Sequence, residues 1–252
     1  MSPRCRTYAC ATVEGASDRQ ERIPGFDQRA LAAARVLCAG AGGLGGEACE
    51  ALVRIGVGDL VVCDGDFVSV DNLNRQLVRP SQVGWNKAVA LARNLSSMGA
   101  LGTRITAVPL FLQDALEFGH APRDPALVLC MVDNDGSREH ATREFGNRVP
   151  LIHAGLDVRA EHGTVFVHEV GGACYGCANP HVAYATAPAA AVCAASCKDL
   201  LKLAAGWTTY AAVSLLTGRR RTWNEQSFVL AAGVTTYRAD RRPDCPWCGG
   251  GR

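Results

Sequence analysis

The sequence predicts an α/β fold, namely a doubly wound, mostly parallel Rossmann-like sheet. Of the 252 residues, 48% are hydrophobic, which is enough for a sizeable core. One apolar segment runs into a glycine cluster, a helical pattern and a second apolar segment within about thirty residues, the length of a βαβ unit. Strand-like and helix-like segments then alternate along the chain, and this alternation is typical of a parallel sheet covered by helices.

The first half of the chain supplies the βαβ unit and its neighbours. From the N-terminus we expect a helix at 26–34, a strand at 35–40, a helix at 43–55, a strand at 59–64, a helix at 85–98 and a strand at 104–109. Residues 1–17 show neither helical nor strand periodicity, so we expect them to form a mobile N-terminal arm.

The second half begins with a fully apolar strand of the kind that is buried on both faces. The expected elements are a strand at 126–133, a helix at 137–147, strands at 150–154 and 165–170, an alanine-rich helix at 194–216, and short strands at 228–231 and 233–237. His153 and His168 lie in strand patterns and are expected to be core residues rather than ligands.

Charge and hydropathy exclude several classes of partner. The formal net charge of +2 gives no argument for binding nucleic acid or an anionic membrane. The most apolar stretch, 185–218, is interrupted by Lys198, Asp199 and Lys202, so it does not resemble a membrane span. The N-terminus lacks the apolar region of a secretory signal. We expect a cytoplasmic protein without nucleic-acid or membrane partners.

The glycine cluster GAGGLG predicts a nucleotide site. Gly40, Gly42, Gly43 and Gly45 satisfy the GxGxxG pattern. Such glycines allow a tight turn and let backbone N–H groups approach a phosphate at the start of a helix. Asp64 follows at the end of the next strand, where a carboxylate can accept hydrogen bonds from ribose hydroxyls. This pattern alone would indicate NAD as readily as ATP.

The polar run after Asp64 favours a triphosphate over a nicotinamide. Its candidate ligand-binding residues are Asp66, Asn72, Arg75, Gln76 and, further on, Lys87. They follow a strand end, where open α/β sheets bind ligands, and the two cations can offset phosphate charge. The alternative is a solvated polar loop.

Asp133 ends the apolar strand at 126–133, where its carboxylate would face the same crevice. Carboxylate oxygens are ligands that Mg²⁺ prefers, so Asp133 is the candidate magnesium residue. The alternative is that Asp133 caps the N-terminus of the following helix.

These motifs, in this order and spacing, resemble the ThiF/MoeB/HesA and ubiquitin-activating-enzyme family over about residues 19–218. The matching segments are GAGGLG, DGD, NLNRQ, Lys87 and VDN at 132–134, together with DRQERIPGF at 18–26. Cys130 departs from the pattern, since many members have an aspartate there.

The resemblance implies a role for each matching residue. Asp64 would contact ribose, and Asp133 would bind Mg²⁺. Asn72, Arg75, Gln76 and Lys87 would contact the phosphates of ATP. Arg19 would reach the ATP site of a partner subunit, which implies a homodimer.

Eight of the twelve cysteines form two groups with different expectations. Cys38, Cys49, Cys63 and Cys130 lie in apolar or helical patterns and are expected to be buried core thiols. The two CxxC pairs have the ligand set of a tetrahedral structural zinc site; these residues are Cys174, Cys177, Cys245 and Cys248. Redox dithiols or disulfides are the alternative. Zinc would fasten a C-terminal part, 171–252, onto the same domain as a nucleotide-binding adenylation core at 18–170.

Cys193 is the candidate catalytic thiol. A cysteine near a helix N-terminus has a lowered pKa, and Lys198 could lower it further. The run VCAAS after CYGCANP resembles the branch that activates the ubiquitin-fold modifier, in which the cysteine of that run carries the modifier as a thioester. Cys197 is the reserve candidate, and a small buried residue is the alternative.

Taken together, the residues and the resemblance imply ATP-dependent adenylation of a carboxylate, with ATP, Mg²⁺ and Zn²⁺ bound. The expected partner is a small ubiquitin-like or sulfur-carrier protein whose terminal carboxylate attacks the α-phosphate. Three alternatives remain, namely adenylation of a peptide or small acid, an NAD(P)-dependent oxidoreductase, and a non-catalytic partner-binding member.

Overall fold

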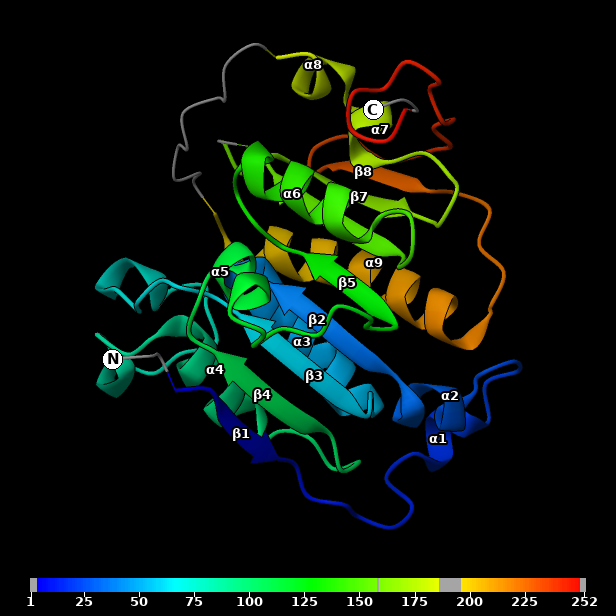
Figure 1. The fold of residues 1–252 in the computed structure, drawn as a ribbon. Coiled ribbons are helices and arrows are strands. Elements are labelled where there is room, and N and C mark those ends of the chain that lie inside the picture. The colour runs from blue at the N-terminus through cyan, green and yellow to red at the C-terminus, as the bar shows by residue number, and fades with distance from the viewer. Residues whose placement is uncertain (1–3, 158, 186–195, 250–252) are drawn as a thin grey trace.

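A computed structural model describes residues 4–157, 159–185 and 196–249 of the chain, which form one nine-stranded sheet with helices on both faces (Figure 1). The strand order is β1-β4-β3-β2-β5-β6-β7-β8-β9. The strands are β1 (Arg6–Ala9), β2 (Arg35–Ala39), β3 (Asp59–Cys63), β4 (Arg104–Val108), β5 (Leu127–Cys130), β6 (Leu151–Leu156), β7 (His162–His168), β8 (Glu225–Val229) and β9 (Gly233–Tyr237).

The five central strands, β4-β3-β2-β5-β6, are parallel. Leu37 in β2 pairs with Val61 in β3 on one side and Val128 in β5 on the other. These strands are continuous apolar runs because both faces of a parallel sheet are covered by helices. The outer pairs β1–β4, β6–β7, β7–β8 and β8–β9 are antiparallel.

Alternate residues of the strands pack against two helical layers. The helices are α1 (Asp18–Glu21), α2 (Gln28–Ala33), α3 (Gly43–Ile55), α4 (Lys87–Leu95), α5 (Leu112–Glu117), α6 (Asp135–Phe145), α7 (Tyr175–Ala178), α8 (Pro180–Ala183) and α9 (Lys198–Thr217). Helices α3, α4 and α9 bury apolar residues on one face, and α5 and α6 do so on the other (Figure 1).

Successive strands are added to the sheet in opposite directions on the two sides of the boundary between β2 and β5. From β2 it passes through α3 to β3 on one side, and from β5 it passes through α6 to β6 on the other. Helices α3 and α6 therefore begin side by side at the carboxyl ends of two neighbouring strands. Open α/β sheets bind their ligands in the crevice at such a switch point.

The predicted doubly wound sheet is confirmed, but the expectation of a mobile arm at 1–17 is wrong for β1. Arg6–Ala9 pairs antiparallel with β4, with Arg6 opposite Ala107 and Ala9 opposite Arg104. An edge strand can be stabilised by backbone hydrogen bonds to its neighbour, so its sequence need not alternate between apolar and polar residues. Helix α5 was not predicted, and β5 ends at Cys130, before Asp133.

The core thiols and histidines lie where they were expected. Cys38, Cys49, Cys63 and Cys130 are at most 1% exposed, and burial raises the pKa of the Cys130 thiol to about 11. His153 and His168 are also buried. Among the described residues, no helix has both the length and the apolar character needed to cross a bilayer.

Candidate active site

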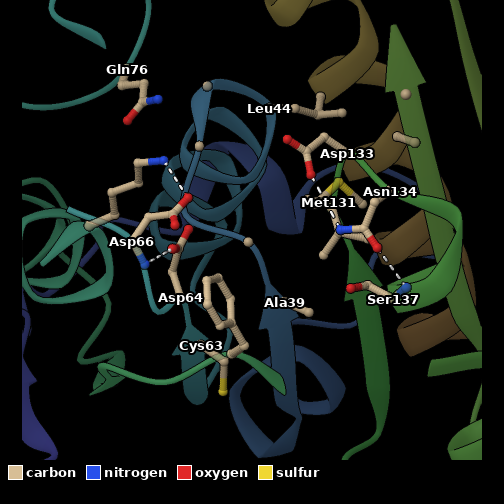
Figure 2. Close-up of a pocket in the computed structure, with 18 of the residues that line it drawn as sticks. Ala39, Leu44, Cys63, Asp64, Asp66, Gln76, Met131, Asp133, Asn134 and Ser137 are labelled. Atoms are coloured by element: carbon tan, nitrogen blue, oxygen red, sulfur yellow. Dashed lines mark hydrogen bonds and ion pairs between the residues drawn. The ribbon is translucent and has the colours of Figure 1, made fainter. Parts of the chain in front are cut away.

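A cavity of about 730 Å³ lies at the switch point of the sheet (Figure 2). The predicted residues that line it are Gly40, Gly42, Gly43, Asp64, Asp66, Asn72, Arg75, Gln76, Lys87 and Asp133. The two expected phosphate-binding cations and the expected magnesium carboxylate therefore share one cavity beside the glycine turn.

The glycines of the turn serve different purposes. Gly40 has a φ of +100°, and a Cβ there would lie 2.5 Å from the carbonyl oxygen of Met131. Gly42 precedes α3 as its N-cap, and a Cβ there would meet nothing within 4 Å. Gly45 does not line the cavity; a Cβ there would lie 2.0 Å from the carbonyl oxygen of Gly40. Gly45 thus allows α3 to pack closely on the turn, while Gly42 leaves open space at the helix N-terminus.

Asp64 fixes the conformation of the glycine turn as well as lining the cavity. Its Oδ2 accepts a hydrogen bond from the Ala41 N–H at 2.7 Å, and its Oδ1 accepts one from the Asp66 N–H at 2.8 Å. The side chain is buried, and this burial raises the pKa of the carboxyl group, against the effect of the two hydrogen bonds. The carboxylate therefore joins the end of β3 to the turn that follows β2.

Both cations are held by oxygen atoms of the polar loop. Lys87 Nζ lies 2.9 Å from Asp66 Oδ2, an ion pair drawn in Figure 2. Arg75 donates to the Asp71 carbonyl oxygen and to Asn74 Oδ1, the latter at 3.1 Å. Each cation is thus held at the cavity wall.

The polar loop is an ordered part of the cavity wall, which disfavours the alternative of a solvated loop. Asn72 is 4% exposed and Gln76 is 8% exposed. Asn72 Oδ1 accepts from the Ser69 N–H at 3.2 Å. Gln76 Oε1 is buried and has no hydrogen-bond partner among the described residues.

Asp133 and Asn134 lie across the cavity from Asp64 and Asp66 (Figure 2). Asn134, not Asp133, caps α6, because its Oδ1 accepts from the Ser137 N–H at 2.8 Å. The alternative role of Asp133 as a helix cap is therefore wrong. The exposed Asp133 carboxylate forms no ion pair within the described part of the chain, so it remains available to a cation.

Two of the predicted catalytic residues, Arg19 and Cys193, are not among the described residues that line this cavity. Arg19 is an exposed residue of α1, which lies away from the glycine turn, beside the C-terminal end of α3 (Figure 1). Cys193 lies outside the described residues. Its reserve, Cys197, is the exposed N-cap of α9, and the neighbouring Ser196 lines the cavity.

The four CxxC cysteines form one cluster. Their sulfur atoms lie within 4.8 Å of one another, with 3.6 Å between Cys174 and Cys245 and 3.4 Å between Cys177 and Cys248. A disulfide would require about 2.05 Å, so the disulfide alternative does not fit. Zinc–sulfur bonds of about 2.3 Å place the sulfurs of a tetrahedral site about 3.8 Å apart, so the four thiols fit a zinc ion.

The sequence analysis missed the second half of the cavity. It is lined by Arg138 and His140 of α6, by residues 154–156 at the end of β6, and by Ser196 before α9. In the sequence, Arg138 is one of several charged residues of a polar helix, and no local pattern separates it from the solvent-exposed ones.

A family model described as "ThiF family" matches residues 17–246. Molybdopterin-synthase adenylyltransferase of Escherichia coli (strain K12) is 36% identical over 165 residues, which are 64% of this chain and 66% of that protein. Ubiquitin-like modifier-activating enzyme 5 of Branchiostoma floridae is 32% identical over 242 residues, which are 88% of this chain and 54% of that protein.

Solved structures share the fold. The structure of E. coli MccB with succinimide has a TM-score of 0.76 at 18% identity and covers 94% of this chain and 75% of that chain. The structure of PaaA has a TM-score of 0.70 at 19% identity and covers 92% of this chain and 76% of that chain. The chain spans 66% of the E. coli relative's length and about half of the Branchiostoma floridae relative's length. The match to the family model covers most of the sequence and includes the whole cavity described above, so the chain belongs to the ThiF family.

Proposed function

We propose that this protein uses ATP to adenylate the C-terminal carboxylate of a small ubiquitin-like or sulfur-carrier protein. The observation that carries the proposal is the convergence of Arg75, Lys87 and Asp133 on one cavity beside the glycine turn. The names of the relatives, an adenylyltransferase and a ubiquitin-like modifier-activating enzyme, support the same chemistry.

In this reaction a carboxylate oxygen attacks the α-phosphorus of ATP. A new C–O–P linkage forms, the bond between the α-phosphorus and the bridging oxygen breaks, and pyrophosphate leaves with the electron pair. Arg75 and Lys87 offset the charge on the phosphates, and Lys87 must then exchange its contact with Asp66 for a phosphate oxygen. Asp133 would hold Mg²⁺, which neutralises phosphate charge when bound.

The cysteine cluster supports a structural rather than a catalytic zinc ion. All four sulfurs are available as ligands, so a tetrahedral ion would have no open position for substrate. Such an ion would tie the segment at 174–177 to the tail at 245–248.

In this proposal a cysteine thiol before α9 receives the acyl group from the adenylate. We keep Cys193 as the acceptor thiol because of the VCAAS run, with Cys197 as the reserve. The thiolate would attack the acyl carbon and release AMP. Cys193→Ala should then retain adenylation but lose a thiol-sensitive covalent adduct with the carrier protein. An adduct that persists in Cys193→Ala and disappears in Cys197→Ala would transfer the role to Cys197.

The proposal is tested by ATP–pyrophosphate exchange with a panel of ubiquitin-like and sulfur-carrier proteins that end in Gly-Gly. We expect exchange with at least one of them and loss of about a hundredfold or more in Asp133→Ala. Asp135→Ala is the matched control, because this neighbouring carboxylate does not line the cavity. Exchange only with a peptide or small acid would change the substrate class. Hydride transfer from NADH without any exchange would overturn the proposal in favour of an oxidoreductase.

A further inference from the structure

The second half of the cavity contains a buried guanidinium without a counter-ion. Arg138 of α6 lines the cavity and is 6% exposed. No carboxylate lies within ion-pair distance of it in the described part of the chain. Burying an unpaired charge is unfavourable, and proteins normally compensate such a charge with a counter-ion or with full hydrogen bonding.

The existing contacts of Arg138 satisfy only part of its side chain. Nη2 donates to the carbonyl oxygens of Val132 at 2.7 Å and Ala154 at 3.1 Å. Nη1 is buried and has no partner among the described residues. A Cβ on Gly155 would lie 2.9 Å from Nη2, so the glycine leaves room for the guanidinium. Nη2 thus joins the ends of β5 and β6, whereas Nη1 has no partner among the described residues, so the hydrogen-bonding capacity of the guanidinium is only partly used.

The position of Arg138 favours a carboxylate over the phosphates of ATP. The phosphate-directed cations, Arg75 and Lys87, come from the loop after β3 and the start of α4. Arg138 instead lies at the ends of β5 and β6, on the Asp133 side of the glycine turn. A planar guanidinium matches the geometry of a carboxylate as well as that of a phosphate, so the position of Arg138 decides between the two. The acid must approach a triphosphate, so a cation on its own side would reduce the repulsion between the two anions.

An aromatic ring also packs against the guanidinium. Its Cζ lies 5.0 Å from the centre of the Tyr175 ring, which stands between Cys174 and Cys177. Tyr175 in turn stacks on Trp247, with ring centres 6.0 Å apart. The segment that carries the cysteine cluster therefore packs an aromatic ring against the guanidinium.

We propose that Arg138 binds the carboxylate of the acid that is adenylated, with its guanidinium at the cavity wall. This inference rests on the proposed function and adds the residue that recognises the second substrate. The carboxylate keeps its charge on binding, no proton is transferred, and one of its oxygens then attacks the α-phosphorus as described above. Arg138 should accordingly govern the affinity for the acid and not the affinity for the nucleotide.

The test uses a synthetic peptide ending in Gly-Gly, in free-acid and C-terminally amidated forms, and the non-hydrolysable nucleotide Mg·AMPCPP. Calorimetry gives the Kd of the nucleotide, and then the Kd of each peptide at saturating nucleotide. In Arg138→Gln we expect the acid to bind about tenfold more weakly or worse, with an unchanged nucleotide Kd. The wild-type protein should prefer the acid to the amide by a similar factor.

Arg93→Gln is the matched control. Arg93 also lies over an aromatic ring, that of Trp85 at 5.2 Å, but it is exposed and outside the cavity. It should bind both ligands like the wild type. If Arg138→Gln does not fold, Arg138→Lys decides, because it keeps the charge but loses the fork. We expect Arg138→Lys to bind the acid several-fold more weakly with an unchanged nucleotide Kd.

Three results would contradict the inference. A folded Arg138 variant that binds the acid as the wild type does would leave Arg138 with a purely structural role. Equal weakening of acid and nucleotide would mean that Arg138 supports the cavity as a whole. A wild-type protein that binds Mg·AMPCPP but does not distinguish acid from amide would remove the carboxylate site and leave the nucleotide site standing. A wild-type protein that binds no nucleotide would instead overturn the proposed function itself.

Discussion

Gly42 and Gly45 belong to the same turn, yet a methyl group added to each would meet different surroundings. At Gly42 the space is empty and open to the cavity, where the N-terminus of α3 presents its backbone N–H groups. At Gly45 the space is filled by the carbonyl of Gly40. The first glycine is therefore expected to serve ligand binding and the second to serve packing.

This difference predicts that alanine at Gly45 mainly lowers stability, whereas alanine at Gly42 mainly weakens nucleotide binding. Gly45→Ala should lower the free energy of unfolding by about 1–3 kcal/mol, because backbone atoms must move. Gly42→Ala should lower it by less than about 1 kcal/mol, the usual effect at an N-cap, but should weaken Mg·ATP binding about tenfold. Urea unfolding and calorimetry measure the two quantities. Equal losses of stability in both variants would argue against this division of roles.

At the scale of single elements, α6 contributes to both the rim and the wall of the cavity. Its cap, Asn134, lies at the cavity rim, and Arg138 lines the wall one turn further on. Its C-terminal end packs on β7, where a Cβ on Gly146 would lie 2.4 Å from the His168 ring. The placement of Arg138 therefore depends on how α6 packs against β7.

His168 makes the contact between β7 and α6 sensitive to acid. Burial, together with the charge of Arg241, lowers the pKa of His168 from 6.5 to about 4. The folded state thus favours the neutral ring, so this stabilisation is present above pH 6.5 and is lost as the pH falls toward about 4. The loss amounts to about 3 kcal/mol.

Urea unfolding of the wild type and His168→Leu across this pH range measures the effect. The wild type should lose about 3 kcal/mol of unfolding free energy relative to His168→Leu as the pH falls from 6.5 to about 4, because only the wild type must keep a buried imidazole uncharged. His181→Leu, at an exposed position of α8, should show the same pH dependence of the unfolding free energy as the wild type. A difference that stays constant with pH would show that the His168 ring does not titrate in this way.

At the scale of the whole molecule, the cysteine cluster joins segments that are distant in sequence. Its inner members pack with Phe166 of β7 and Trp247 of the tail, forming a small core separate from the two helical layers. Metal bound there would hold the tail at 245–248 against the segment that contains Tyr175.

Removal of this cluster should therefore lower stability. In Cys245→Ser we expect loss of about one zinc ion per chain and a melting temperature lower by several degrees. Cys197→Ser is the control, because this exposed cysteine is outside the cluster, and its zinc content should be unchanged. Elemental analysis and calorimetric melting are the measurements. If the wild-type protein contains no stoichiometric zinc, the four-cysteine cluster is not a zinc site.

A homodimer in which Arg19 completes the partner's site makes a different prediction. Arg19→Ala and Asp133→Ala should each abolish most of the exchange activity. When mixed and allowed to exchange subunits, they should regain about a quarter of the wild-type rate, because half of the dimers then contain one intact site. No recovery, with sedimentation confirming mixed dimers, would show that Arg19 does not act across the dimer.

The sequence alone determined the parallel core and the half of the cavity that is lined by the glycine turn and the polar loop. Helix α3 was predicted with its observed bounds, Gly43–Ile55. The six candidate residues chosen between Asp64 and Lys87 all line one cavity, as the position of strand ends in a parallel sheet requires. These features are local, because glycine turns, apolar strands and strand ends each depend on residues that are close together in the sequence. The CxxC pairs are local in the same sense, and their spacing was enough to predict one four-cysteine site.

Only the tertiary structure decided the rest. Strand β1 exists because β4 offers it a free edge, and Asn134 rather than Asp133 caps α6 because β5 ends early. Arg138 looks like any surface arginine in the sequence, but the packing of α6 between β6 and the segment of Tyr175 buries it beside the cavity. The physical reason is that burial and the absence of a counter-ion depend on distant segments, which no local pattern records.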